Sequence, residues 1–360
     1  MPFDASTDAS PERRPRLTPP IADIRRAVRG VLPSTGPETA AGGPPDHRAP
    51  LALVALSGGA DSLALAAGVA FEAPRAGWRA GAVIVDHGLQ DASAEVADRA
   101  AAQARALGLD PVLVRRVDVV AEGDGPEASA RAARYAALDA AAAETGAEVV
   151  LLAHTLDDQA ETVLLGLARG SGGASLAGMA PRAGRYARPL LGIRRAETRQ
   201  ACAEAGLDPW DDPHNVDPAY ARVRVRERVL PLLEAELGPG VAEALARTAE
   251  QLREDEDAFR DQIEEFIEEV CEPAEAGIAI SVGWLAANPA AIRQRVIRHV
   301  VASEFGVALS RTQTLEVARL VTDWSGQGPI DLPRGIRATR AGRHVVFSTT
   351  GSTEVLPHDH

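Results

Sequence analysis

Short apolar runs alternate with longer Ala- and Leu-rich segments in the first half of the chain. The apolar runs lie at 51–56, 81–85, 112–119 and 149–153, and the segments that follow them lie at 61–72, 91–107, 127–145 and 157–169. Uninterrupted apolar runs of this length are typical of strands buried on both faces, and the longer segments are typical of helices. The alternation predicts an α/β fold with a parallel, doubly wound sheet.

Together with the regions around it, this pattern predicts four parts of the chain. In order, they are a disordered tail, short helix and linker (1–17, 20–32 and 33–49), the sheet domain (50–240), a smaller and mainly helical domain (241–350) and a tail (351–360). A Gly- and Arg-rich stretch at 170–188 predicts a mobile loop inside the sheet domain. The elements expected in the smaller domain are a long amphipathic helix at 241–271, helices at 288–304 and 311–322, and a β-unit at 329–348.

Composition excludes several classes of protein. Hydrophobic residues make up 46% of the 360 residues, which is enough for a sizeable core. No apolar run reaches the roughly 18 residues that cross a bilayer, and residues 1–20 lack the apolar segment of a secretory signal. The two cysteines, Cys202 and Cys271, form no CxxC pair. Their spacing argues against an iron–sulfur cluster or a structural zinc and fits a cytoplasmic protein.

The net charge of −13 does not exclude a nucleic-acid partner, because the acidic residues are concentrated. Residues 250–272 hold eleven Asp or Glu and two Arg, and the rest of the chain is near neutral with local Arg clusters. All 38 basic residues are Arg, so a Walker-type phosphate loop, which needs a Lys, is impossible.

Polar residues follow three of the predicted strands directly. Ser57, Asp86 and His154 each lie within about one residue of the end of a strand. In a parallel sheet these ends share one edge, where ligands bind. The sequence therefore predicts a pocket at this edge of the sheet.

The segment Ser57-Gly58-Gly59-Ala60-Asp61-Ser62 has the features of a phosphate-binding loop. Its glycines let backbone N–H groups approach a phosphate, the following helix adds its positive end, and the two serines add hydroxyl donors. A carboxylate repels phosphate, so Asp61 is expected either to hold a bridging Mg²⁺ ion or to shape the loop. An ordinary turn between a strand and a helix is the alternative.

Further strings resemble one enzyme family in a fixed order. SGGADS resembles the SGGxDS loop of the PP-loop superfamily of N-type ATP pyrophosphatases, whose fold is Rossmann-like. The other matching strings are VDHGL at 85–89, RAARY at 131–135, AHTLDDQAET at 153–162, RPLL at 188–191, WDDPHN at 210–215 with Tyr220, and RVRVR at 222–226. Together, over about 51–232, they resemble the tRNA(Ile)-lysidine synthetase family, and the remainder resembles that family's smaller substrate-binding domain.

The resemblance implies a ligase that uses ATP and Mg²⁺. Such an enzyme adenylates O2 of the first anticodon cytidine in an isoleucine tRNA with a CAU anticodon. Free L-lysine then attacks C2, which gives lysidine, AMP and pyrophosphate. Two alternatives stay open: another PP-loop synthetase that acts on a small metabolite or another tRNA base, or an RNA-binding protein without activity. The oligomeric state is not readable from the sequence.

The resemblance also assigns roles to individual residues. It implies catalytic roles for Asp61, His154, Asp158 and Glu161, with Asp61 also as a magnesium ligand, and ATP contacts for residues 57–62 and Asp86. It implies tRNA contacts for Arg131, Arg134, Arg222, Arg224 and Arg226. Asp158 and Glu161, three apart on one helix face, could bind Mg²⁺, ribose hydroxyls or the ammonium group of lysine. Many members have a second His where this chain has Thr155, to which we assign no role.

Overall fold

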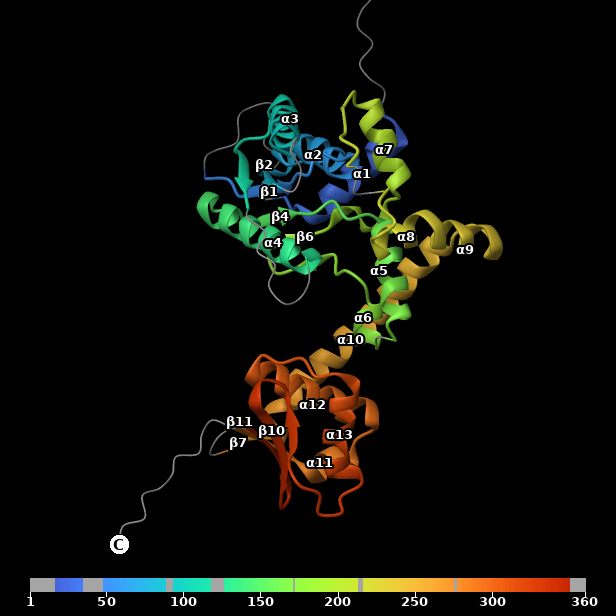
Figure 1. The fold of residues 1–360 in the computed structure, drawn as a ribbon. Helices are drawn as coiled ribbons and strands as arrows, with labels where there is room; N and C mark the ends of the chain where they lie inside the picture. Colours follow the sequence, from blue (N-terminus) through green and yellow to red (C-terminus); the bar gives the residue numbers. More distant parts are fainter. Residues whose placement is uncertain are drawn as a thin grey trace, which may run out of the picture. The chain divides into compact units, whose positions relative to one another are not determined.

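The computed structural model describes residues 17–34, 48–88, 93–117, 126–170, 172–212, 216–274 and 277–349. The contacts divide the chain into two compact units, residues 1–253 and residues 254–360 (Figure 1). The division falls inside helix α10 (Val241–Val270), which begins in the first unit and ends in the second. The tails predicted at 1–17 and 351–360 and the centre of the predicted linker lie outside the described residues, apart from Leu17.

Six strands form the sheet of the first unit, in the order β3-β2-β1-β4-β6-β5. Their bounds are β1 (Leu51–Ala55), β2 (Arg79–Asp86), β3 (Val112–Arg116), β4 (Val149–Leu151), β5 (Arg182–Ala183) and β6 (Tyr186–Ala187). All neighbouring pairs are parallel except the edge pair of β5 and β6. The four predicted strands are therefore present and parallel.

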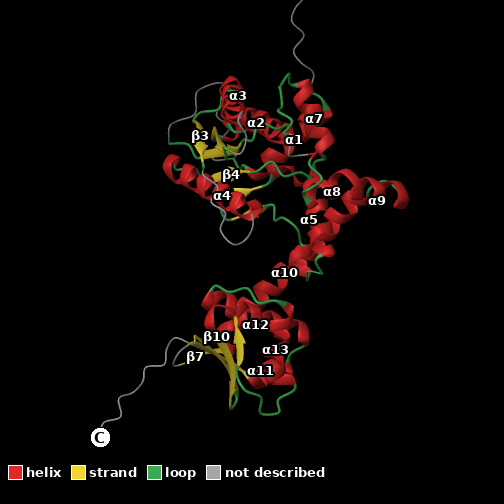
Figure 2. Cartoon of the chain, in the orientation of Figure 1, coloured by secondary structure: helices red, strands yellow, loops and turns green. Residues whose placement is uncertain are grey.

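Helices cover both faces of this sheet, which is why its central strands are apolar throughout (Figure 2). On one face Ala52 and Val54 join a core with α1 (Pro19–Val31), α2 (Ala60–Glu72), α3 (Ser93–Ala106) and α7 (Arg195–Glu204). On the other face Leu51 and Leu53 pack with α4 (Pro126–Thr145). The doubly wound arrangement predicted from the alternating pattern is confirmed.

A glycine permits the close packing of α1 on α2. A Cβ atom at Gly68 would lie 2.8 Å from Cγ2 of Ile24 and 3.4 Å from Cγ2 of Val28, both on α1. Ile24 and Val28 are buried one turn apart on the same helix face. The short helix predicted at 20–32 is thus confirmed and belongs to the first unit.

One segment differs from the expected pattern, and a second takes a form that the sequence pattern left open. The stretch 170–188 is not a plain loop, because it contains α6 (Gly173–Leu176) and the β5–β6 hairpin, which extends the sheet beyond β4. The alternating arginines of 222–228 do not form a strand: they lie on α8 (Ala221–Arg224) and a π-helical turn, Val225–Val229. Their side chains therefore spread around a helix. Helices α5 (Leu156–Ala168) and α9 (Leu230–Leu237) also belong to the first unit.

The second unit combines helices with an antiparallel sheet in the order β7-β8-β11-β10-β9. Its elements after α10 are β7 (Cys271–Ala274), β8 (Gly277–Ser281), α11 (Val282–Ala287), α12 (Ala290–Phe305), α13 (Arg311–Thr322), β9 (Ile330–Leu332), β10 (Ile336–Ala341) and β11 (His344–Thr349). The predicted helices and β-unit are present, and β7 and β8 are additional strands. No helix in the described parts of the chain has the length and apolarity needed to cross a membrane.

Candidate active site

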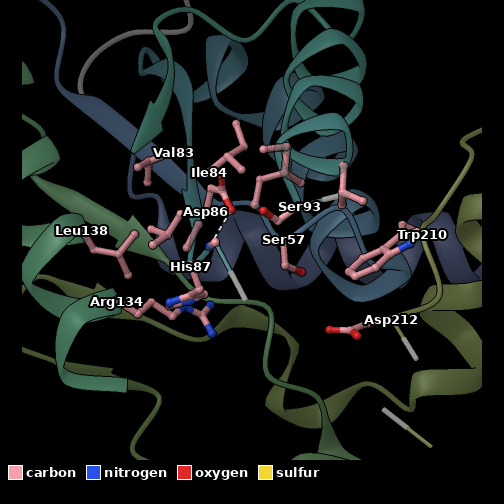
Figure 3. Close-up of a pocket in the computed structure, with 16 residues that line it drawn as sticks. Ser57, Val83, Ile84, Asp86, His87, Ser93, Arg134, Leu138, Trp210 and Asp212 are labelled. Carbon is pink, nitrogen blue, oxygen red and sulfur yellow. Dashed lines mark hydrogen bonds between the residues drawn. The ribbon is translucent and has the colours of Figure 1, made fainter. Parts of the chain in front are cut away.

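Three predicted residues lie at the carboxyl edge of the first sheet, and two of them, Ser57 and Asp86, line the same cavity. Asp86 ends β2, Ser57 follows β1 and His154 follows β4, and these three strands are neighbours in the sheet. A cavity of about 260 Å³ opens between β1, β2 and α3. It is lined by Ala55, Leu56, Ser57, Val83, Ile84, Val85, Asp86, His87, Gly88, Ser93, Val96, Ala97, Arg134, Leu138, Trp210 and Asp212. In Figure 3, Ser57 lies between Trp210 on one side and His87 with Arg134 on the other.

The loop after β1, predicted to bind phosphate, is a tight turn that depends on glycine. Gly58 has a φ of 84°, which side chains other than glycine rarely adopt. The N–H of Ser57 donates to Oγ of Ser62 at 3.2 Å, and that hydroxyl donates to the carbonyl oxygen of Gly59 at 2.9 Å. Ser62 is buried, so its hydroxyl shapes the turn. Helix α2 begins at Ala60, which directs its positive end toward the loop.

Trp210 forms a wall of the cavity and also holds the loop. Its main-chain N–H donates to the carbonyl oxygen of Gly58 at 2.9 Å. Two residues earlier, Asp208 is held to Gln103 of α3 by two hydrogen bonds. The side-chain N–H of Gln103 donates to the carbonyl oxygen of Asp208 at 2.9 Å, and the main-chain N–H of Asp208 donates to Oε1 of Gln103 at 3.0 Å. The segment after α7 therefore closes one side of the cavity.

Polar groups at the other side of the cavity are incompletely paired. Asp86 is buried, and its Oδ1 accepts from the N–H of Gly88 at 2.9 Å, so it shapes the turn after β2. Nδ1 of His87 is buried without a hydrogen-bond partner, and burial and the charge of Arg134 lower the pKa of His87. Within the described residues Arg134 has no hydrogen bond or ion pair, and burial lowers the pKa of its guanidinium. Such a group favours an incoming anion.

Thr155, which replaces a second His, has a structural role. Thr155 is buried at the N-cap of α5, where its Oγ1 accepts from the N–H of Asp158 at 3.4 Å while the Asp158 carboxylate accepts from the N–H of Thr155 at 2.8 Å. This reciprocal capping box fixes the start of the helix. Burial opposes ionisation of Asp158, but Arg195 and the bonds from Thr155 hold the pKa of its carboxyl below its ordinary value.

His154 lies just before this cap in a cationic setting. Its Nδ1 is buried and has no hydrogen-bond partner. Burial lowers the pKa of His154 to about 4, and the charges of Arg134, Arg188 and Arg131 act in the same direction against that of Asp158. The imidazole is therefore neutral near pH 7 and can exchange hydrogen bonds or a proton with a ligand.

Glu161 is the centre of an arginine cluster. Its carboxylate is fully buried, at 0% exposure, and it accepts from Nε of Arg226 at 2.7 Å and from Nη1 of Arg195 at 3.1 Å. Nε of Arg222 lies 3.4 Å from the same carboxylate, and its Nη2 donates to the hydroxyl of Thr162 at 2.9 Å. Arg222 and Arg226, predicted to contact tRNA, are thus engaged within the protein here.

The remaining predicted arginines lie elsewhere. Nη1 of Arg224 donates to the carbonyl oxygens of Pro218 and Ala219, both at 2.7 Å. Arg131 is exposed, with its guanidinium 4.9 Å from the ring centre of Tyr135, to whose hydroxyl it donates at 3.2 Å. Neither arginine is paired with a carboxylate in these contacts.

Asp61 faces helix α7. The hydroxyl of Thr198 donates to its Oδ1, and Nε of Arg195 lies 3.5 Å from its Oδ2. Burial raises the pKa of Asp61, while Thr198 and Arg195 act in the opposite direction. In the part of the chain that the structure describes, no three His, Cys, Asp or Glu side chains gather as a metal site. A magnesium ion here would need phosphate oxygens to complete its ligands.

A second cavity, of about 210 Å³, adjoins the arginine cluster. Its walls combine three carboxylates and three guanidinium groups with a few apolar side chains: Asp157, Glu161, Arg194, Arg195, Arg226, Leu230, Pro231, Glu234 and Ala242. Charges of both signs in one small cavity fit a ligand that itself carries both signs.

Comparisons with known proteins identify the family of this chain. A sequence model described as "PP-loop domain" matches residues 42–233, and one described as "TilS substrate binding domain" matches residues 280–343. A tRNA(Ile)-lysidine synthase from Leifsonia xyli subsp. xyli is 65% identical over 298 residues, which cover 82% of this chain and 89% of that protein. The chain belongs to the tRNA(Ile)-lysidine synthase family. The predicted family, fold class and enzyme class are thereby confirmed.

Other relatives agree. Family members from Streptomyces coelicolor and Thermobifida fusca are 51% identical over 357 residues and 49% identical over 333 residues, covering 91% and 92% of this chain and 98% of each relative. The solved structure of the U34-tRNA thiolase NcsA from Methanococcus maripaludis has a TM-score of 0.52 at 20% identity, and covers 65% of this chain and 80% of that one. That likeness concerns the fold alone.

Sequence reasoning missed several residues of the site. Arg195 and Thr198 contact Asp61 from α7, and Gln103 fixes the segment that carries Trp210. Trp210 belonged to a matching string but received no role. That string was the signal that could have found Trp210, whereas only long-range contacts mark Arg195, Thr198 and Gln103.

Proposed function

We propose that this enzyme adenylates O2 of the first anticodon cytidine of an isoleucine tRNA with a CAU anticodon and then attaches free L-lysine at C2. The observation that carries the proposal is the turn at Ser57–Ser62, open to a cavity of about 260 Å³ at the carboxyl edge of a parallel sheet. Such a turn presents backbone N–H groups to phosphates, and the cavity beside it has apolar walls for a base. ATP fits both parts.

The first step would form a bond between O2 of cytosine and the α-phosphorus of ATP and would release pyrophosphate. The carbonyl oxygen is a poor leaving group, and its adenylate ester is a good one. His154 follows β4, the neighbour of β1, so it lies at the same edge of the sheet as the phosphate turn, and its imidazole is neutral near pH 7. We assign it to hydrogen bonding with the cytosine or the α-phosphate. Mg²⁺ would be held by Asp61 and phosphate oxygens and would neutralise charge.

In the second step the ε-amine of lysine, having lost a proton, would attack C2 and displace AMP. We place the amino acid in the second cavity, with its ammonium groups toward Asp157 and Glu161 and its carboxylate toward Arg194. Asp157 and Glu161 are both engaged by arginines in this structure, at 3.3 Å from Arg194 and 2.7 Å from Arg226. Lysine would therefore have to displace part of this cluster.

The tRNA would approach from the same edge of the sheet. Arg131 and Arg134 flank His154 without carboxylate partners, and they suit phosphate contacts. We assign the same role to Arg224 and expect Arg222 and Arg226 to take it up only if tRNA loosens their bonds to Glu161. The domain that follows the sheet domain, about 241–350, would bind the rest of the tRNA, and the reaction would take place in the cytoplasm.

The test incubates the protein with ATP, Mg²⁺, labelled lysine and bulk tRNA. Label that stays on RNA after mild alkali indicates a modified base, because an ester-linked amino acid would be released. AMP should form only when both tRNA and lysine are present. AMP formation without tRNA would favour a small-molecule synthetase, and tRNA retention without any AMP would indicate a binding protein.

Asp61→Ala supplies the matched variant. It should abolish AMP release while tRNA retention on a filter stays close to that of the unchanged protein, since Asp61 contacts α7 at the start of the helix that follows the turn. Normal AMP release in this variant would contradict the role assigned to Asp61.

A further inference from the structure

One face of helix α7 contacts the start of the phosphate turn's helix. Arg195, Thr198 and Cys202, spaced i, i+3 and i+7, lie on that face. The first two contact the carboxylate of Asp61, and Sγ of Cys202 donates to the carbonyl oxygen of Ala60 at 3.1 Å. Three side chains along one face of α7 therefore hold residues 60–61 in place.

Arg195 also reaches the other half of the site. Its Nε lies 3.5 Å from Asp61, its Nη2 donates to Asp158 at 2.7 Å and its Nη1 donates to Glu161 at 3.1 Å. Each nitrogen of the guanidinium thus faces a different carboxylate. The main-chain N–H of Arg195 donates to Oδ2 of Asp157 at 2.7 Å, which fixes the backbone of Arg195.

These contacts connect the starts of the two helices that follow neighbouring strands. Asp61 lies in the first turn of α2, after β1, and Asp158 and Glu161 lie on α5, after β4. Without a cation between them, the carboxylates of Asp61 and Asp158 would repel each other at the edge of the sheet. The planar fork of Arg has donors on three separate nitrogens, one for each carboxylate, whereas Lys has its three donors on one nitrogen.

We infer that Arg195 is a positioning residue that sets the ATP-binding turn and the amino-acid side of the site relative to each other through one guanidinium group. The inference rests on the proposed function, which gives the two sides their substrates. Arg195 contacts neither reacting atom in this scheme. Its removal should disturb nucleotide binding and lysine transfer together, because both sides share one support.

The experiment compares the unchanged enzyme with Arg195→Ala, Arg195→Lys and Arg199→Ala. Arg199 is the matched control, since it lies one turn further along α7 and, among the described residues, its guanidinium forms an exposed contact with Asp211 at 3.8 Å. Affinity for AMPCPP, a non-hydrolysable ATP analogue, is measured with Mg²⁺ by calorimetry. Lysine transfer to tRNA is measured at saturating substrates, with and without millimolar guanidinium ion.

We expect Arg195→Ala to weaken AMPCPP binding about 10-fold and to lower kcat for lysine transfer about 100-fold, a common effect of a misplaced catalytic geometry. Guanidinium ion should restore part of both losses, and Arg195→Lys should restore neither. Arg199→Ala should match the unchanged enzyme. A loss of only one of the two quantities, or losses that guanidinium ion does not repair, would overturn the inference.

A second variant guards against misfolding of Arg195→Ala. Thr198→Val keeps the shape of a buried side chain but removes its hydrogen bond to Asp61. It should weaken AMPCPP binding several-fold and leave the Arg195 contacts with Asp158 and Glu161 in place. The fold-decrease in kcat for lysine transfer should therefore be smaller than the fold-decrease in AMPCPP affinity. The reverse order would contradict the inference. If the unchanged protein transfers no lysine, the proposed function fails, and the AMPCPP titrations still decide whether Arg195 supports the turn.

Discussion

Trp210 and Gly58 are joined by a main-chain hydrogen bond of 2.9 Å, although they lie in distant parts of the sequence. The bond places the indole of Trp210 on the cavity beside the phosphate turn, where Figure 3 shows it opposite His87 and Arg134. One contact therefore shapes the turn and supplies a wall for the nucleotide.

Replacement of Trp210 by Ala should weaken ATP binding about 10-fold. An aromatic side chain against a base contributes about 1–3 kcal/mol, and Ala would leave that wall open. The measurement is calorimetric titration with AMPCPP in the absence of tRNA. Trp324→Ala, in the second unit, is the control and should leave the affinity unchanged. An unaltered affinity in Trp210→Ala would show that the base lies elsewhere.

Gly58→Ala should abolish ATP-dependent activity while the protein still folds. Gly58 has a φ of 84°, and a Cβ there would lie 3.4 Å from Cβ of Ala100. A non-glycine residue in this region costs about 1–2 kcal/mol, which the turn can avoid only by changing shape. Activity is measured as AMP release with tRNA and lysine present.

Gly108→Ala is a closely matched control for this prediction. Gly108 has the same φ of 84°, but a Cβ there would meet no atom within 4 Å. Both variants should lose a similar amount of stability in thermal unfolding, and only Gly58→Ala should lose activity. Equal losses of activity would attribute the effect to general strain.

The sheet and its turn could be predicted because their signals are local. The fully buried strand Leu51–Ala55 is a continuous apolar run, and the glycines of the turn follow it directly. The hairpin at 182–187 was missed because its strands have two residues each, too few to show an alternating pattern. Strand β7 was missed for a different reason, because Pro273 interrupts it.

The arginines show where local pattern fails. Arg at every second position left both a strand and a helix open, and tertiary packing places Arg222, Arg224 and Arg226 on helical turns. Two of them pair with the buried Glu161, which needs cations because an isolated buried carboxylate is costly. Arg195 stands outside every matching string, and its importance arises only from carboxylates that are distant in the sequence.

Glu161→Gln should destabilise the first unit by about 3 kcal/mol. The substitution keeps the size of the side chain but removes one of the two carboxylates that Arg195 and Arg226 share, and loss of one partner of a buried ion pair typically costs about 3–5 kcal/mol. Lysine transfer should also fall. The measurement is urea unfolding followed by circular dichroism.

Glu256→Gln is the control for this substitution. Glu256 forms a single, partly exposed pair with Arg295 in the second unit, at 2.5 Å. Partly exposed pairs contribute up to about 1 kcal/mol, so this variant should unfold close to the unchanged protein. Similar losses in the two variants would show that the arginine cluster around Glu161 contributes no more to the free energy of unfolding than a single, partly exposed ion pair.

His154→Gln should make the first unit less sensitive to mild acid. Burial lowers the pKa of His154 to about 4, while the ordinary value is 6.5. Between these two pH values the unfolded chain binds a proton that the folded chain does not, so the free energy of unfolding falls as the pH falls from 6.5 toward 4. Gln does not titrate, and the variant should lose less stability over that window.

The measurement is urea unfolding at about pH 7 and about pH 5, with His299→Gln in the second unit as the control. A loss in His154→Gln as steep as in the unchanged protein would show that His154 is accessible to protons in the folded state, and it would remove the physical basis for a neutral imidazole beside the phosphate turn.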